Sequence, residues 1–426
     1  MTLAYLQVGQ PEHGICRYGR LLAAEGRTRS DVAILERSIV LTGTGSRDRR
    51  DLRTLAGDLS EADLVHLQVS MWPDDTWGEK WQSLLNLREF RRHCRVPLAF
   101  TLHDVNRLAS LNCGRAGSCL ARIALEIVKG PLRPPVRLLR QLSKRQLRPA
   151  AAFHRAWDLE PICPCVLAHW IARAGQALFT LSGSEEKVLH AMGIGLKTIL
   201  IPHFVENPPP IRVPPHREGL PTKTVIVAGF LVGSKGHELL LDAMPLLPGI
   251  QVVFVGGPSP GALGHDKGSD LMELAKRKGT HDRLRVTGYL AEHEYQRYLH
   301  AADLAVCPFP ETKSASGSLS SLIAAECPTL ASDIPLIAEY NAIVPGAIRV
   351  FRPYTPEALA TAIRTLLEMP REALTCGLAE LRQRLSIASI YDRHAEVYRR
   401  VLARPSSPPS SSSSAATRMS SESELD

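Results

Sequence analysis

The hydrophobic residues of this chain gather in short continuous runs, and the segments between the runs carry apolar residues at helical spacing. Short apolar runs bounded by turn residues are typical of strands buried on both faces, whereas helical spacing is typical of helices that bury one side. The two patterns alternate, which predicts an α/β fold with helices on both faces of parallel sheets. The expected strands are residues 2–8, 31–35, 64–69, 98–102 and 177–181, followed by 224–228, 251–255, 284–287, 304–307 and 329–331, with helices between them such as 237–246 and 292–302.

A proline-rich segment separates the two series of strands. Residues 207–216 read Asn-Pro-Pro-Pro-Ile-Arg-Val-Pro-Pro-His, which suits neither a helix nor a central strand. We therefore expect a first domain over residues 1–206, a linker over 207–222 and a second domain from residue 223. Open α/β sheets bind ligands beyond the carboxyl ends of their strands, so function is expected on loops that face a cleft between the domains. Residues 405–426 are rich in Ser and Pro and are expected to be a disordered tail.

The composition is that of a folded protein. The chain has 426 residues, of which 44% are hydrophobic and 22% are charged, and this excludes collagen-like and wholly disordered chains. No apolar stretch approaches the ~20 residues needed to cross a bilayer. The N-terminal residues lack the basic and apolar regions of a secretory signal, so the expected location is the cytoplasm. The nine cysteines are scattered, as suits a reducing compartment. One loose cluster departs from zinc-site spacing and is expected to hold unpaired or packed thiols: Cys113, Cys119, Cys163 and Cys165.

The chain is basic, with a formal net charge of +8, which favours an anionic partner. Basic side chains concentrate in an expected insertion at about residues 110–160, where leucines are interleaved and Glu126 is the lone acid between residues 115 and 155. Two interpretations remain open. The segment is either an amphipathic helix that binds an anionic membrane surface, at the inner face of the membrane, or a solvated basic face. It has few aromatic residues and no recognised nucleic-acid module, so nucleic acid is not an expected partner.

A glycine-rich segment in the second domain is suited to phosphate. Residues 229–236, Gly-Phe-Leu-Val-Gly-Ser-Lys-Gly, follow an expected strand and precede an expected helix, which places backbone amides and the Lys235 ammonium at a helix N-terminus. The spacing is not that of a Walker loop, which argues against ATP hydrolysis of that type. The alternative is that Lys235 is an exposed loop lysine.

A second segment of the same domain has small hydroxyl residues around a glycine. Residues 313–321 read Lys-Ser-Ala-Ser-Gly-Ser-Leu-Ser-Ser and lie before an Ala-rich helix. Ser316, Gly317 and Ser318 at a helix start can donate hydrogen bonds to an anion without steric obstruction. Two such helix starts in one domain suggest a diphosphate ligand. Ordinary serine capping of the helix is the alternative.

One histidine of the first domain is a candidate for chemistry. His103 lies at the carboxyl end of an expected strand, next to Asp104, where it would project into the cleft. A structural role for a lone histidine is the alternative. The sequence suggests no Ser-His-Asp hydrolase elbow, so nucleophilic ester chemistry has no support.

Taken together, these segments resemble the retaining glycosyltransferases of family 4, which have the GT-B architecture. The resemblance runs from residue 3 to about residue 398 and is most specific in the second half. In the first domain it is carried by Gly14, by His103 and by the Pro-His-Phe sequence at 202–204. In the second domain it is carried by residues 225–236, 286–289, 302–308 and the last helix at 391–398.

The resemblance implies two Rossmann-like α/β/α domains facing a central cleft, with a donor nucleotide-sugar domain at 223–384 and a helix at 385–404 that crosses back to the first domain. It implies transfer of a sugar, with retention of anomeric configuration, from a nucleotide diphosphate sugar to a hydroxyl of a saccharide or lipid-linked saccharide. His103 would be the catalytic group and would bind the transferring sugar. The donor would be bound by Gly14, Lys235, Tyr289, Ser316, Gly317, Ser318 and Leu319. No cofactor or metal is implied, because Lys235 and the helix starts supply positive potential.

Two departures from the family pattern concern the donor site. Phe230 stands where the family commonly has an Arg that binds the diphosphate. The two glutamates of the family fall by spacing on Lys313 and Ser321, and the usual Gly before Cys-Pro is Glu326. The diphosphate would then be held by Lys235 and the serine segment alone. The alternative is a catalytically weak or inactive GT-B homologue that binds a nucleotide sugar or a partner transferase.

Overall fold

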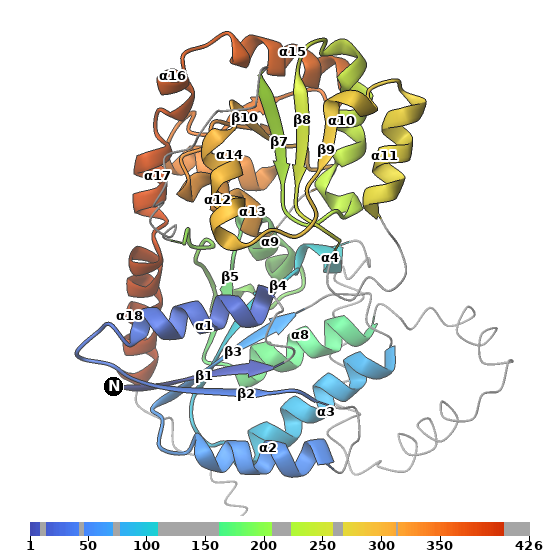
Figure 1. The fold of residues 1–426 in the computed structure, drawn as a ribbon. Helices are drawn as coiled ribbons and strands as arrows, with labels where there is room; N and C mark the ends of the chain where they lie inside the picture. The colour runs from blue at the N-terminus through green and yellow to red at the C-terminus, as the bar shows by residue number, and fades with distance from the viewer. Residues whose placement is uncertain are drawn as a thin grey trace, which may run out of the picture.

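The computed structural model describes residues 1–8, 14–41, 47–70, 77–109, 162–206, 223–258, 267–311 and 314–403. These residues form two parallel sheets, each enclosed by helices (Figure 1). The predicted insertion at 110–160, the linker at 207–222 and the tail at 405–426 lie outside the described residues.

The first sheet has the strand order β2-β1-β3-β4-β5-β6. Its strands are β1 Thr2–Val8, β2 Ala33–Ile39, β3 Leu64–Ser70, β4 Leu98–His103, β5 Ala177–Thr180 and β6 Thr198–Leu200. Its helices are α1 Gly14–Gly26, α2 Arg47–Asp58, α3 Trp77–His93, α4 Asn106–Ala109, α8 Ile162–Ala174 and α9 Gly183–Ala191.

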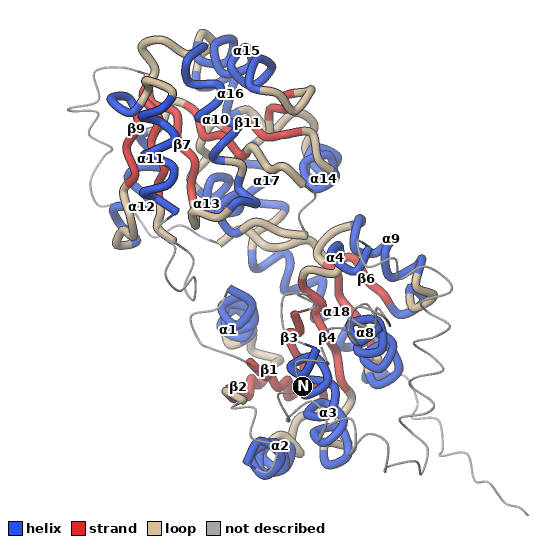
Figure 2. The backbone as a smooth tube through the Cα atoms, turned by 90° about the vertical axis from the view of Figure 1, so that its right-hand side faces the viewer, coloured by secondary structure: helices blue, strands red, loops and turns tan. Residues whose placement is uncertain are grey.

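The second sheet has the strand order β12-β11-β10-β7-β8-β9. Its strands are β7 Thr224–Ala228, β8 Gln251–Val255, β9 Leu284–Val286, β10 Leu304–Cys307, β11 Thr329–Ser332 and β12 Arg349–Phe351. Its helices are α10 His237–Ala243, α11 Lys267–Arg277, α12 Glu292–Ala301, α13 Gly317–Ala324, α14 Pro335–Ile343, α15 Pro356–Leu367, α16 Arg371–Thr375 and α17 Leu378–Arg384. Figure 2 shows both domains with the strands inside and the helices outside.

The predicted α/β fold with two parallel sheets is confirmed. The strands at 2–8, 224–228, 251–255 and 304–307 have the predicted bounds. Strand β2 begins and ends later than predicted, because its second half, Glu36, Arg37 and Ser38, is polar at an exposed sheet edge. Strands β6 and β12 were not predicted. Both are three-residue edge strands, too short to show a hydrophobic pattern.

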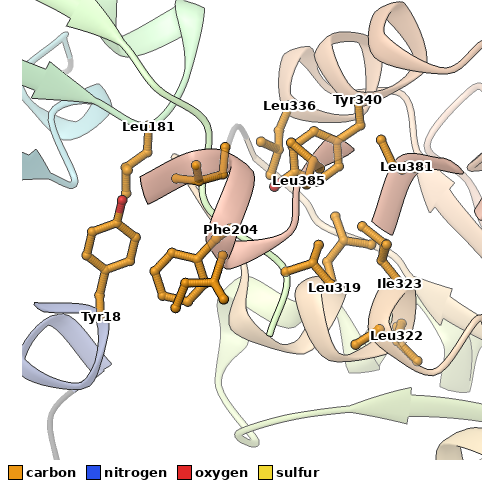
Figure 3. Packing of buried hydrophobic residues seen from close by; sticks show 14 of the residues in the cluster. Tyr18, Leu181, Phe204, Leu319, Leu322, Ile323, Leu336, Tyr340, Leu381 and Leu385 are labelled. Atoms are coloured by element: carbon orange, nitrogen blue, oxygen red, sulfur yellow. The ribbon is translucent and has the colours of Figure 1, made fainter. Parts of the chain in front are cut away.

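One hydrophobic core is shared by the two domains. It contains Leu3 and Tyr5 on one face of the first sheet and Ile226 and Val253 on one face of the second, together with the helices between the sheets. In Figure 3, Phe204 lies between Tyr18 of α1 and Leu319 of α13. The outer face of each sheet packs against its own helices in a separate core. The shared core therefore connects the two domains.

The chain passes between the domains at two places that run side by side. Val205 donates its amide to the Leu385 carbonyl at 2.7 Å and forms an isolated parallel bridge with Ser386. Helix α18, Ile387–Ala403, then packs against α1 of the first domain (Figure 1). Arg29 pairs with Asp392 at 3.1 Å, and Arg399 pairs with Asp31 at 2.8 Å. The last helix of the described chain is therefore part of the first domain.

Two further observations concern the expectations about thiols and membrane spans. Cys165 is disulfide-bonded, so the prediction that its thiol would be unpaired is wrong. Spacing identified no zinc pattern around it, but spacing alone cannot show which cysteines the fold brings within bonding distance. Among the described helices, none has the length and apolar composition that crossing a bilayer requires.

Candidate functional site

The loops that carry Lys235 and the serine segment meet at the switch point of the second sheet. Strands β7 and β10 are neighbours in that sheet, and the strand order runs away from them in opposite directions. The loops after two such strands leave opposite faces and open a crevice at their carboxyl ends, where α/β proteins bind ligands. Residues 229–236 follow β7, and residues 308–316 follow β10.

Lys235 lies against the serines that the sequence singled out separately. Its Nζ donates to Ser316 Oγ at 3.2 Å and to Ser318 Oγ at 2.5 Å, and it lies 5.3 Å from the centre of the Phe309 ring. Both serines are at least nine-tenths buried. Lys235 is therefore not an exposed loop lysine, and the two segments form one cluster, which we call the Lys–Ser cluster: Lys235, Ser316 and Ser318.

Ser316 also caps a helix. Its Oγ accepts the Leu319 amide at 3.3 Å at the N-terminus of α13, so the capping alternative holds for this residue. Gly317 is the first residue of α13, and a side chain there would meet open space. The Leu319 side chain is buried in the shared core, so only its backbone faces the cluster (Figure 3). The first turn of α13 contains no acidic residue. A helix N-terminus beside an ammonium group favours a bound anion.

Two glycines allow the loops to approach this closely. Gly229 has a φ of +109°, and a Cβ there would lie 3.1 Å from the Ser318 Cβ. Gly236 has a φ of +71°, and a Cβ there would lie 1.8 Å from the Pro308 carbonyl oxygen. Any other residue at Gly236 would separate the loop after β7 from the loop after β10.

An aromatic pair lies beside this crevice. Phe230 follows β7 and is 45% exposed, and Tyr289 follows β9 and is 60% exposed. Their ring centres are 6.5 Å apart in an edge-to-face arrangement, and the Tyr289 hydroxyl donates to the Pro258 carbonyl. Exposed aromatic faces held in place beside an anion site can stack on a planar group such as a nucleobase.

His103 is the last residue of β4 and lies at the carboxyl edge of the first sheet, as predicted. It is 7% exposed, its Nε2 lies 2.9 Å from Gln68 Oε1, and its ring meets Tyr18 edge-on at 5.4 Å. Gly14 begins α1, and a side chain there would meet open space. The sequence analysis did not identify Gln68 as a neighbour of His103. A signal was present, because His66 and Gln68 are polar residues two apart in an apolar strand and so lie on one face of β3.

Glu185 holds the turn after His103. The backbone of Asp104 has a φ of +62°, which is unfavourable for a residue other than glycine. The Glu185 carboxylate accepts the Val105 amide at 2.8 Å and the Leu181 amide at 3.0 Å. Burial raises the pKa of Glu185 to about 7. Sequence reasoning missed this residue, because a glutamate in the first turn of a helix is ordinary.

The two halves of the site touch through Ser314. Asn106, three residues after His103, donates to Ser314 Oγ at 3.4 Å, and Glu185 also hydrogen-bonds to Ser314. Ser314 is two residues before the Ser316 cap. The loop that carries His103 and the loop that carries the serines are therefore in contact across the domains.

The residues at which the chain departs from the family pattern lie in different surroundings. Lys313 lies outside the described residues. Ser321 is a partly buried residue of α13 whose Oγ donates to the Gly317 carbonyl at 3.0 Å. Glu326 has a φ of +48° and pairs with Arg382 at 3.1 Å, so the left-handed turn is kept without glycine. Among the described residues, no group of three or more His, Cys, Asp or Glu side chains is arranged to hold a metal ion.

Residues 222–369 match the family model described as glycosyl transferases group 1. A D-inositol 3-phosphate glycosyltransferase of Mycobacterium marinum is 29% identical over 127 residues, which cover 30% of this chain. The match spans only a quarter, 25%, of that relative's length.

Solved structures are similar over nearly the whole chain. HepE from Anabaena, determined with UDP and glucose, superposes with a TM-score of 0.65 at 16% identity and covers 94% of this chain and 100% of its own. Sucrose-phosphate synthase from Thermosynechococcus elongatus superposes with a TM-score of 0.64 at 17% identity. The match covers 95% of this chain and 99% of the synthase chain. The chain thus has the GT-B fold of these structures, and residues 222–369 match the model of the group 1 glycosyl transferases.

Proposed function

We propose that this protein is a glycosyltransferase that moves a sugar from a nucleotide diphosphate sugar to a hydroxyl of a saccharide or lipid-linked saccharide, with retention of anomeric configuration. The observation that carries the proposal is the Lys–Ser cluster at the switch point of the second sheet. The match of this domain to the group 1 glycosyl transferases supports the reaction class. The structural neighbour determined with UDP and glucose supports UDP as the first nucleotide to test.

In this proposal the second domain binds the donor. Lys235 and the N-terminus of α13 bind the diphosphate, and Gly229 and Gly317 let it approach the backbone. The nucleobase stacks beside Phe230 and Tyr289. At the position of Phe230 the family pattern has an Arg that binds phosphate. Lys235 is then the principal cation of this cluster, since the hydroxyls of Ser316 and Ser318 add hydrogen bonds but no charge.

The chemistry follows from this placement. The bond between the anomeric carbon and the diphosphate oxygen breaks, and the diphosphate leaves with the electron pair. The acceptor oxygen bonds to the anomeric carbon and loses its proton to the departing group. Lys235 and the α13 amides stabilise the charge that develops on the diphosphate, where fixed donors are most effective. His103 contacts the transferring sugar from the first domain, across the contact formed by Asn106 and Ser314.

A test uses Lys235→Ala, with Lys278→Ala as the matched control. Lys278 is a partly buried lysine that pairs with Asp242 at 2.7 Å, away from the cluster. Release of nucleotide from a panel of UDP- and GDP-sugars gives the activity, and calorimetric titration with UDP and GDP gives the affinity. Losing one charge-assisted contact to a partly buried diphosphate costs about 2–4 kcal/mol, so kcat/KM should fall by about 30- to 1,000-fold.

The outcomes separate the proposal from its alternative. Wild-type turnover that is lost in Lys235→Ala and kept in Lys278→Ala supports the proposal. Wild-type binding of UDP or GDP without turnover of any sugar donor would instead favour the inactive GT-B homologue. Equal kinetics of Lys235→Ala and wild type would show that the Lys–Ser cluster does not bind the diphosphate.

A further inference from the structure

A chain of buried polar side chains runs behind His103 through the first domain. Gln68 Oε1 lies 2.9 Å from His103 Nε2, and Gln68 Nε2 lies 3.3 Å from His66 Nε2. The same His66 nitrogen lies 2.8 Å from Thr101 Oγ1. The other ring nitrogen, Nδ1, lies 2.6 Å from the Tyr398 hydroxyl. The hydrogen bonds are therefore continuous from α18 to the candidate site.

The fold explains why these residues meet. His66 and Gln68 are two apart in β3 and so point to the same face of the sheet. Gln68 is level with Thr101 of β4 in the strand register. Tyr398 comes from α18, which packs on that face. All of these side chains are at most 4% exposed, so water does not compete for their hydrogen bonds.

With the Gln68 amide oxygen toward His103 and the amide nitrogen toward His66, one proton arrangement follows. Burial, and the nearby His394 and His103, hold the pKa of His66 well below its usual range, so its ring is neutral and carries one proton. The Gln68 amide nitrogen can only donate, so His66 Nε2 accepts and His66 Nδ1 donates to Tyr398. The amide oxygen of Gln68 can only accept, so His103 Nε2 donates to it. In neutral His103 the proton is thereby placed on Nε2, which makes Nδ1 the acceptor.

We propose that Gln68, His66 and Tyr398 are positioning residues that set the ring orientation and the proton location of His103. This rests on the proposed function for its catalytic consequence, but not for the hydrogen bonds themselves. An imidazole held in one tautomer presents one defined group to a sugar hydroxyl, whereas a freely flipping ring presents either. Because α18 supplies Tyr398, the helix that follows the interdomain crossing takes part in placing the catalytic histidine.

The experiment compares three variants. Gln68→Met keeps the length of the side chain and removes both hydrogen bonds. Tyr398→Phe removes only the hydroxyl that His66 contacts. Tyr391→Phe removes a hydroxyl from the same helix that reaches Tyr398 only through Tyr5 and makes no hydrogen bond to His66, and it serves as the control.

Nitrogen NMR of protein labelled at histidine reports the tautomer of His103, whose signals are assigned by their loss in His103→Gln. In the wild type we expect a protonated Nε2 and an unprotonated Nδ1 in the neutral ring. Gln68→Met should move the signals of the two nitrogens toward each other, and Tyr398→Phe should shift them in the same direction by less. With donor sugar, Gln68→Met should lower kcat by about 10- to 100-fold, as loss of a group that orients a functional histidine does. Calorimetric affinity for UDP should stay within about twofold of wild type, because Gln68 is not in the donor domain.

Unchanged His103 nitrogen signals in folded Gln68→Met and Tyr398→Phe would overturn the proposal. A change in Tyr391→Phe as large as in Tyr398→Phe would also overturn it, since the effect would then come from general loosening of α18. Folding is checked by circular dichroism for each variant. If the wild type neither binds UDP nor turns over a sugar donor, the proposed function fails, and the NMR result still decides whether Gln68 positions His103.

Discussion

Replacing Gly236 by Ala should destabilise the second domain through one contact. The new Cβ would lie 1.8 Å from the Pro308 carbonyl oxygen and 2.9 Å from the Pro308 carbonyl carbon, so the loop after β10 must move. That carbonyl also accepts the Tyr354 hydroxyl at 2.9 Å, which resists the movement. In addition, alanine would have to adopt the left-handed φ of +71°.

The expected cost has two parts. A left-handed residue other than glycine costs about 1–2 kcal/mol, and forcing extra volume into a packed contact costs about 1–3 kcal/mol. The sum of about 2–5 kcal/mol corresponds to a fall in Tm of about 10 °C for a domain of this size. Thermal unfolding followed by circular dichroism measures it.

Two other glycines provide controls. Gly249 has a φ of +74° but no atom within 4 Å of the place that a Cβ would take, so Gly249→Ala should carry only the backbone cost, about 4 °C in Tm. Gly233 lies in the same loop as Gly236, has open space and no left-handed φ, and Gly233→Ala should bind UDP like the wild type. If Gly236→Ala and Gly249→Ala have the same Tm, the loop after β7 and the loop after β10 are not packed as described. The geometry of the Lys–Ser cluster then loses its support.

Ser318→Ala should weaken UDP binding in calorimetry without lowering Tm. Ser316→Ala should weaken binding and also lower the free energy of unfolding by about 1 kcal/mol, because it removes a helix cap. Equal Tm values for the two variants would contradict the capping assignment. Stability should also fall steeply as the pH drops from 6.5 to 5, because burial lowers the pKa of five of the described histidines, which stay neutral when folded and take up protons when unfolded. These are His66, His203, His237, His300 and His394. Glu185 and Glu206 have raised pKa values and oppose the trend, because they bind protons in the folded state first. A net uptake of about two protons on unfolding lowers the free energy of unfolding by ~3 kcal/mol for each pH unit of acidification. Urea unfolding measures this change, and a midpoint urea concentration that stays constant between pH 6.5 and 5 would refute the prediction.

The fold class and one half of the candidate site could be predicted from local sequence patterns. Strands β7, β8 and β10 were predicted with their observed bounds because each is an uninterrupted apolar run, and burial on both faces leaves that local pattern. Lys235 and the serine segment were recognised for the same kind of reason, since glycine and small hydroxyl residues at a helix start are local signals.

Which of these residues meet depends on the way the chain packs in three dimensions. Lys235 and Ser318 are 83 residues apart, and His66 and Tyr398 are 332 apart. Their contacts depend on the strand order and on where α18 returns, and no hydrophobic pattern encodes either. Glu185, Gln68 and Ser314 look like ordinary polar residues in the sequence, because hydrogen bonding to a distant partner leaves no mark on their own neighbours. The disulfide at Cys165 was missed for the same reason, since sequence spacing does not report distance in space.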